Sequence, residues 1–242
     1  AAVVNLGCGL DSTGRSCDNG SCKIYNLDFP DVIAVRNELL PTGEREENIP
    51  CDLNDTEWFS QIDASSGAVF FASGVFYYFL TEQVRTLVQK MADAFPGGVL
   101  VFDAANRTAV KMIAKTWLKS AKIKDVGAYF AVSNAKSELS LWDSRLQVTS
   151  RGYMLGYNDL KDPSIGGFFR LLAKVGDGMM KMQIVKIGFG GGKWRKAENV
   201  RRPCNEIHRY AHGDVGAVCR LISKAADSGV RLRYEYGKSH HE

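Results

Sequence analysis

A glycine-rich turn and two aspartates are the residues whose types and spacing point most directly to chemistry. Residues 7–11 (Gly-Cys-Gly-Leu-Asp) follow a short apolar run, and Asp28 ends the next apolar run, 19 positions after Gly9. Glycines let a ligand approach the backbone closely, and an acidic residue at this spacing can accept hydrogen bonds from both hydroxyls of a ribose. Asp52 follows a third apolar run, where a carboxylate can bind an adenine amino group. Together these residues predict a nucleoside site.

Two cofactor classes compete for such a site. A dinucleotide favours Gly-x-Gly-x-x-Gly, whose third glycine brings a helix N-terminus to the pyrophosphate, and that position is Ser12 in this chain. An adenosyl cofactor without phosphates does not need this arrangement, so it is favoured over NAD(P). Simpler interpretations stay open: the two glycines could form a plain tight turn, and Asp52 could be a turn or capping residue before Asp55 and Trp58.

The elements that must position these residues follow from the hydrophobic pattern. Short apolar runs alternate with helical patterns, which is typical of a mostly parallel sheet. Strands are expected at 3–6, 24–27, 47–51, 68–72, 99–102, 147–155 and 181–189. The clearest helix spans 84–95 behind Thr81 as a candidate N-cap, and another runs from Pro30 to before Pro41. We predict an α/β, doubly wound, Rossmann-like seven-stranded sheet with helices on both faces and an antiparallel last strand.

The chain divides into a neutral body and a basic tail. Residues 1–189 hold 20 Lys and Arg against 21 Asp and Glu, whereas residues 190–242 hold 11 against 6, which accounts for the formal net charge of +4. We expect one domain at 1–189, with inserted lid helices at about 108–146, and a basic, poorly ordered extension of no assigned role at 190–242. An amphipathic helix with lysines on one face begins near Val110; those lysines form either a solvated face or an anion-attracting lid.

Four segments resemble the leucine carboxyl methyltransferase family, which includes the polyketide O-methyltransferases. They are residues 6–11, 25–33, 51–53 and 74–80, and the match runs in order from residue 2 to about 189. The resemblance implies a class I, S-adenosylmethionine-dependent O-methyltransferase. The chain departs from the family at Ser73, where many members carry Glu, at Arg15, which stands a little late, and in lacking helices before the first strand.

By this resemblance the turn would lie under the methionine part of the cofactor, Asp28 would hold the ribose, and Asp52 with Leu53 would hold the adenine. The predicted cofactor-binding residues are Gly7, Gly9, Asp11, Asp28, Asp52, Leu53, Ser73 and Gly74.

The acceptor site is expected after the fourth and fifth strands. Tyr77, Tyr78 and Asp103 are candidates for catalysis, and Tyr77, Asn106 and Arg107 for substrate binding. Core packing of the tyrosines and helix capping by Asp103 and Asn106 are the alternatives. All four histidines lie in the tail, so the body offers no imidazole base. A carboxylate acceptor needs no base, and a phenol could be deprotonated by Asp or Tyr.

Other classes of function are disfavoured. The neutral body argues against nucleic acid as a partner, and the longest apolar stretch, 67–80, is shorter than the ~20 residues of a membrane helix. The six cysteines are too few for a disulfide scaffold, so a cytoplasmic protein is expected, with Cys17 and Cys22 as free thiols rather than a local bridge. The expected partner is a small-molecule methyl acceptor. No metal is expected, although Cys204, His208, His212 and Cys219 could form a zinc set. A non-catalytic nucleoside-binding relic stays open, and residues are expected before Ala1, because the chain starts without Met inside a strand pattern.

Overall fold

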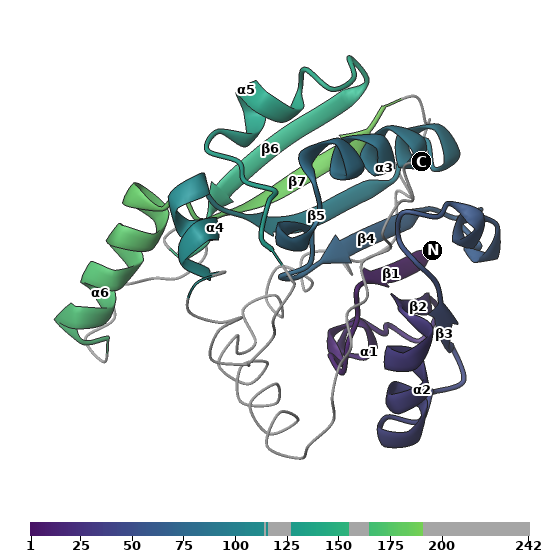
Figure 1. Ribbon diagram of the computed structural model, residues 1–242. Coiled ribbons are helices and arrows are strands. Elements are labelled where there is room, and N and C mark those ends of the chain that lie inside the picture. The colour runs from purple at the N-terminus through teal and green to yellow at the C-terminus, as the bar shows by residue number, and fades with distance from the viewer. Residues whose placement is uncertain (114, 116–126, 155–164, 191–242) are drawn as a thin grey trace, which may run out of the picture.

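A seven-stranded sheet organises the chain in the computed structural model, which describes residues 1–113, 115, 127–154 and 165–190 (Figure 1). The strand order is β3-β2-β1-β4-β5-β7-β6. The strands β1 to β5 pair in parallel, whereas β7 lies antiparallel to both β5 and β6. Their bounds are β1 Ala2–Leu6, β2 Lys23–Asp28, β3 Glu46–Pro50, β4 Ala68–Ala72, β5 Val99–Ala104, β6 Leu146–Gly152 and β7 Gln183–Phe189. The predicted fold class is confirmed.

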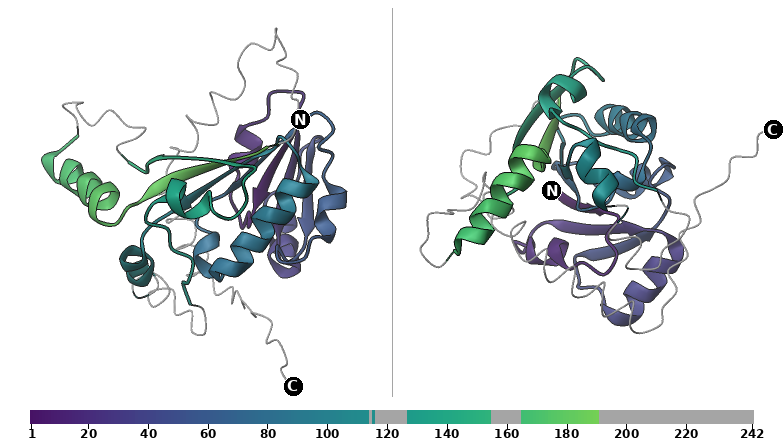
Figure 2. Two further views of the ribbon diagram at one scale, coloured as in Figure 1. Left: turned by 90° about the horizontal axis from the view of Figure 1, so that it is seen from above. Right: turned by 60° about the vertical axis from the view of Figure 1, so that its left-hand side comes forward.

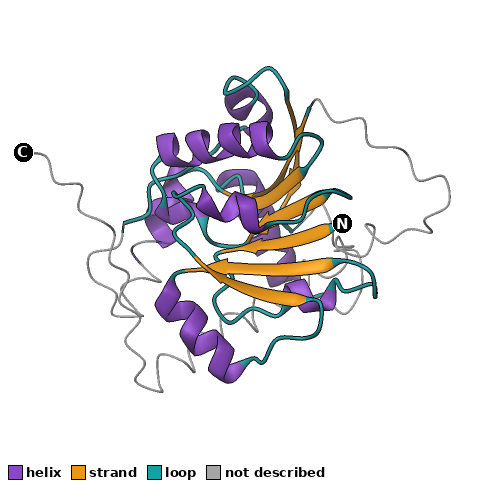
Figure 3. Ribbon diagram, turned by 90° about the vertical axis from the view of Figure 1, so that its right-hand side faces the viewer, coloured by secondary structure: helices purple, strands orange, loops and turns teal. Residues whose placement is uncertain are grey.

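Helices lie on both faces of the sheet (Figures 1 and 3). Their bounds are α1 Thr13–Ser16, α2 Pro30–Leu39, α3 Thr81–Ala94, α4 Arg107–Ile113, α5 Ala135–Leu139 and α6 Gly167–Lys174. Because side chains alternate along a strand, Ile24 and Asn26 of β2 face α1 and α2, while Tyr25 and Leu27 face the side of the sheet that α3 covers.

The helix α3 forms because its apolar residues recur every three or four positions. Val84, Leu87, Val88 and Met91 are buried against the sheet, as the sequence predicts. Thr81 as N-cap was wrong: it is the first helical residue, and the N–H of Leu80 donates to Oε1 of Gln83 at 2.8 Å instead.

Aromatic packing fills the space between the sheet and α3. Trp58 stacks on Phe95 with ring centroids 6.3 Å apart, and Phe70 lies 4.8 Å from the same ring. Phe95 follows α3, while Trp58 belongs to a short 3₁₀ helix, Glu57–Gln61, that precedes β4. Large rings of this kind bury much apolar area each, so this core fixes the strands that end at the site.

The segments after β5 are only partly described. The inserted helix begins at Arg107, three residues before the expected start, because Asn106 caps it. Its lysines Lys119 and Lys122, the end of the predicted sixth strand at Leu155, and residues 191–242 with their candidate zinc set lie outside the described residues. The helix α6 projects past the end of β6 and the start of β7 (Figure 2), with Phe168, Phe169, Leu171 and Leu172 exposed.

Two simpler observations complete the fold. None of the helices in the described ranges has the length and apolar character that a bilayer crossing requires. Cys17 and Cys22 are not joined by a disulfide; the Cys22 thiol lies 3.7 Å from the carbonyl oxygen of Cys17.

Candidate functional site

The glycine turn leaves β1 and crosses the carboxyl end of β2. Gly7 has φ +66° and Gly9 has φ +47°, the left-handed region that glycine adopts without the cost of a Cβ. The N–H of Cys8 donates to the carbonyl of Leu27 at 2.9 Å, and the N–H of Asp11 donates back to the carbonyl of Cys8. The turn therefore lies at the edge of the sheet where doubly wound folds bind ligands.

Two glycines at this edge face open space. A Cβ added to Gly9 or to Gly74 would meet no heavy atom within 4 Å. Gly7 differs, because a Cβ there would lie 2.6 Å from a methyl carbon of Val75, in the loop after β4. Gly7 thus joins two loops, whereas the backbones of Gly9 and Gly74 are uncovered; we call this part of the sheet edge, at Gly9 and Gly74, the cradle.

Asp28 lies beside this cradle with both carboxylate oxygens engaged by backbone. Its Oδ2 accepts from the N–H of Gly9 at 2.7 Å, and its Oδ1 accepts from the N–H of Phe29 at 2.8 Å. The side chain is buried, and this burial raises the pKa of Asp28, although the two N–H groups oppose the shift. A carboxylate has about four lone-pair sites, so it can still accept from two ligand hydroxyls.

The carboxylate of Asp11 accepts hydrogen bonds from Thr13, which follows in the chain, and from Asn5 of β1. Oδ1 accepts from the N–H of Thr13 at 3.0 Å and from its hydroxyl at 2.7 Å, while Oδ2 accepts from the amide of Asn5. These contacts fix the start of α1.

Asp52 and Leu53 follow β3 on the same edge of the sheet. Asp52 is exposed, and its Oδ1 accepts from the backbone N–H and the side-chain amide of Asn54, both at 2.9 Å. The turn role that the sequence left open is therefore present. Leu53 is buried in the main core. The N–H of Cys51 donates to the carbonyl of Asp28, which ties this loop to the Asp28 side of the cradle.

Asp103, near the end of β5, connects this strand to the loop after β4. The N–H of Gly74 donates to its Oδ1 at 2.6 Å, and Ser73 beside it is exposed. Burial raises the pKa of Asp103, and burial together with the nearby Asp103 carboxylate raises the pKa of Tyr77. Tyr78 is half-buried, and its pKa is raised by burial as well. The structure thus brings the three candidates for catalysis together, next to the Gly74 side of the cradle.

Asn106 and Arg107 begin α4. Asn106 accepts from the N–H of Ala109 with its Oδ1 at 3.0 Å and donates with its amide to the carbonyl of Met179 at 2.7 Å. It therefore caps the helix, the alternative left open above. Arg107 is exposed on the first turn.

Two residues that support the glycine turn, Gly14 and Arg36, were not identified from the sequence. Gly14, rather than position 12, is the glycine that lets α1 approach the sheet, because a Cβ there would lie 3.0 Å from Ile24. Arg36 of α2 is buried and contacts the glycine turn. The burial of Arg36 could have been inferred from the sequence, because Arg36 falls on the face of α2 that also buries Val32 and Ile33.

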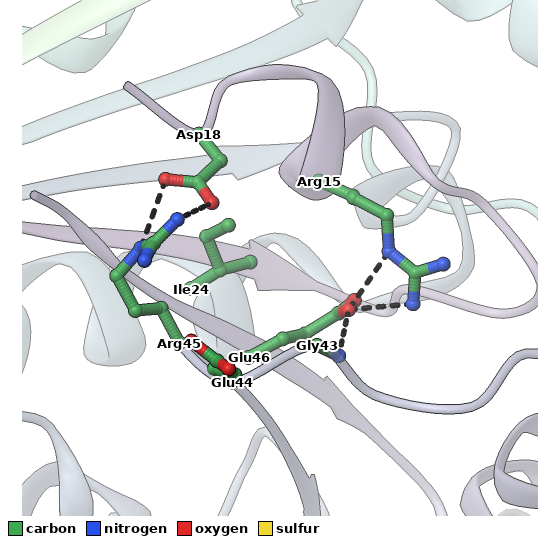
Figure 4. Close-up of a pocket in the computed structure, with 7 residues that line it drawn as sticks. All are labelled: Arg15, Asp18, Ile24, Gly43, Glu44, Arg45 and Glu46. Carbon is green, nitrogen blue, oxygen red and sulfur yellow. Dashed lines mark hydrogen bonds and ion pairs between the residues drawn. The ribbon is translucent and has the colours of Figure 1, made fainter. Parts of the chain in front are cut away.

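A cavity of about 270 Å³ lies at the starts of β2 and β3, away from the predicted cofactor residues (Figure 4). Arg15, the arginine that stands late in the motif, pairs there with Glu46 at 2.6 Å, and Arg45 pairs with Asp18 at 2.6 Å. These charges pair with one another, so this cavity is not the candidate site.

Asp103→Asn is expected to raise the melting temperature at neutral pH. Asparagine keeps the Oδ1 acceptor for Gly74 but removes a charge that burial disfavours. A change of about 1 kcal/mol would shift Tm by about 2–4 °C in a domain of this size. Because the folded-state pKa is raised, the gain should be present above that pKa and vanish as the pH falls through it toward the ordinary aspartate value. Thermal unfolding followed across pH measures this.

Asp143→Asn provides a control of opposite sign. Hydrogen bonds from Arg145 lower the pKa of Asp143 to about 2, so its removal should reduce stability at neutral pH, with the difference disappearing toward pH 2. A gain at Asp103 that persists unchanged in acid would contradict the role of burial.

Comparison with known proteins shows what this geometry resembles. A sequence model of the leucine carboxyl methyltransferase family matches residues 1–92, which hold β1 to β4, the glycine turn, Asp28 and Asp52. The resemblance to the leucine carboxyl methyltransferases is confirmed. The tetracenomycin polyketide synthesis O-methyltransferase TcmP of Streptomyces glaucescens is 27% identical over 105 residues, 43% of this chain. The matched region spans only 39% of TcmP.

Solved structures show a likeness at the level of the fold. A putative methyltransferase from Thermobifida fusca YX gives a TM-score of 0.56 at 17% identity, over 79% of this chain and 73% of that one. LepI in complex with S-adenosylmethionine gives 0.52 at 14% identity, over 79% and 43%. At these identities the likeness concerns the fold alone.

Proposed function

We propose that this protein is an S-adenosylmethionine-dependent O-methyltransferase that acts on a carboxylate or hydroxyl of a small molecule. The observation that carries the proposal is the cradle at Gly9 and Gly74, with the buried Asp28 carboxylate beside it. The family resemblance and the O-methyltransferase TcmP support the same reaction.

The described residues fit an adenosyl cofactor. Asp28 would accept hydrogen bonds from the ribose hydroxyls with the lone pairs that Gly9 and Phe29 leave free. Asp52, exposed on the neighbouring loop, would accept from the adenine amino group through Oδ2, since Oδ1 serves Asn54. Gly9 and Gly74 would lie against the methionine part. The cofactor supplies a methyl group activated by a sulfonium, and the main task of the chain is alignment of the acceptor.

Asp103 is the residue that we propose to meet the acceptor hydroxyl. Its raised pKa makes it a better proton acceptor than an ordinary aspartate, and Tyr77 would orient the acceptor beside it. A carboxylate acceptor would need no proton transfer, and Arg107, exposed at the start of α4, would attract it by charge.

A nicotinamide-dependent oxidoreductase fits less well. A pyrophosphate needs the N-terminus of a substantial helix, and α1 has only four residues. The near-neutral charge of residues 1–189 favours a small-molecule partner over nucleic acid. The free thiols of Cys8, Cys22 and Cys51 are consistent with a cytoplasmic location.

Calorimetric titration of the full chain with S-adenosylhomocysteine and with NAD tests the proposal. We expect S-adenosylhomocysteine to bind and NAD to give no heat of binding. Asp52→Asn should weaken S-adenosylhomocysteine about tenfold, because it removes a charged acceptor and keeps the turn to Asn54. Binding of NAD alone would support the oxidoreductase instead. Binding without methyl transfer to any carboxylate or phenol in a panel of acceptors would indicate a nucleoside-binding relic.

A further inference from the structure

We propose that Arg36 is a positioning residue that holds the glycine turn in the shape that receives the cofactor, an inference that rests on the proposed function. Its guanidinium reaches the turn from α2, where Nη1 donates to the carbonyl of Gly9 at 3.0 Å and to the carbonyl of Asp11 at 2.7 Å. The side chain is only 1% exposed.

Gly9 is therefore held at both of its backbone polar atoms. Its N–H donates to Asp28 from one side, and its carbonyl accepts from Arg36 on the other. A glycine with φ +47° has no Cβ to restrict it, so the backbone would otherwise sample many conformations. Fixing the turn before a ligand arrives lowers the entropic cost of binding.

The burial of a permanent charge argues that Arg36 has a specific task. A buried guanidinium is costly unless it is paired and hydrogen-bonded. Here Nη2 lies 3.4 Å from Oε1 of Glu46, whose side chain is 3% exposed, and Nε donates to Asn48 at 3.2 Å. Asn26 donates to the same Glu46 oxygen at 2.8 Å. These polar side chains occupy the sheet face beneath the turn, where apolar side chains would be buried without a desolvation penalty.

Arg15 offers a matched comparison within the same network. It pairs with the other oxygen of Glu46, Oε2, at 2.6 Å (Figure 4). It also donates to the carbonyl of Pro41. Within the described part of the chain, the Arg15 side chain donates to Glu46 and Pro41 and not to the glycine turn. Arg15 and Arg36 thus share a carboxylate, and they differ in whether they hold Gly9 and Asp11.

Hydrogen exchange of the ligand-free chain, read by mass spectrometry on the peptide that contains residues 7–13, tests the assignment directly. Arg36→Met should speed exchange in this peptide at least tenfold and weaken S-adenosylhomocysteine by about 10–100-fold in calorimetry. Arg36→Lys keeps the charge and one donor toward the carbonyls, so it should recover part of both effects. Arg15→Gln should leave both measurements within twofold of the parent chain.

Exchange at residues 7–13 that stays at the parent rate in Arg36→Met would overturn the assignment. So would an equal rise in the β4 and β5 peptides, which would mean general destabilisation. If Arg36→Met does not fold, Arg36→Lys alone decides, because a normal turn and normal affinity there would also refute a specific guanidinium role. Failure of the parent chain to bind S-adenosylhomocysteine would refute the proposed function, while the exchange data would still show whether Arg36 holds the turn.

Discussion

Asp28→Ala should weaken S-adenosylhomocysteine at least about 100-fold, because two ligand hydrogen bonds to a charged acceptor are each worth about 1.5–3 kcal/mol. The change also leaves the N–H groups of Gly9 and Phe29 without their acceptor. Isothermal titration calorimetry measures the loss. Asp31→Asn is the matched control: it removes a carboxylate three residues away, on the first turn of α2, whose recorded partner is the N–H of Val32. Equal losses in both variants would contradict the role of Asp28.

The same carboxylate predicts how binding depends on pH. Burial raises the pKa of Asp28, so protonation sets in at a higher pH than for an ordinary aspartate. Since the ionised form is the ribose acceptor, affinity should be complete above the raised pKa and fall as the pH drops through it. In Asp28→Ala this part of the pH profile should be flat.

Gly7→Ala should destabilise the fold by about 2–5 kcal/mol, which is the combined cost of a left-handed residue with a Cβ and of overpacking. The added carbon would lie 2.6 Å and 2.8 Å from the two methyl carbons of Val75, and φ is +66°. Such a loss is a large part of the stability of a typical domain. Urea denaturation followed by circular dichroism gives the change in the free energy of unfolding.

Two companion variants separate the causes. Gly7→Ala combined with Val75→Ala should recover the packing part and leave only the backbone strain, seen as a favourable coupling in the double-mutant cycle. Gly9→Ala, at φ +47° with open space around it, should cost only about 1–2 kcal/mol of stability. If Gly7→Ala proves no worse than Gly9→Ala, the contact with Val75 is not what requires glycine.

The fold was predictable because its strands are short apolar runs between strong helix and turn signals. The buried stripe of α3 and the run of β4 indicated their elements from residue types alone. The predicted position of Asp28 was equally accessible, because the end of a parallel strand places its side chain at the ligand edge. The predicted antiparallel last strand is confirmed as well, since β7 lies antiparallel to both of its neighbours.

What the sequence could not show are contacts to backbone atoms. An arginine in a helix is ordinarily solvated, and the carbonyls of Gly9 and Asp11 that attract Arg36 exist only once the turn is folded. For the same reason the sequence left two interpretations of Asn106 open, substrate binding and helix capping. Only the folded loop shows that its amide donates to the carbonyl of Met179.

The strand order also bears on how the chain folds. β1 precedes both β2 and β4 in the chain yet lies between them, so its second partner strand is not synthesised until about sixty residues after it, at Ala68–Ala72. Until then one edge of β1 stays open, with the apolar side chains of Val3, Val4 and Leu6 beside it. Pairings between strands so distant in sequence form slowly. A nascent chain therefore exposes an unpaired strand edge during translation, which can pair with other chains. We expect co-expressed chaperones to raise the soluble yield more than lower temperature alone.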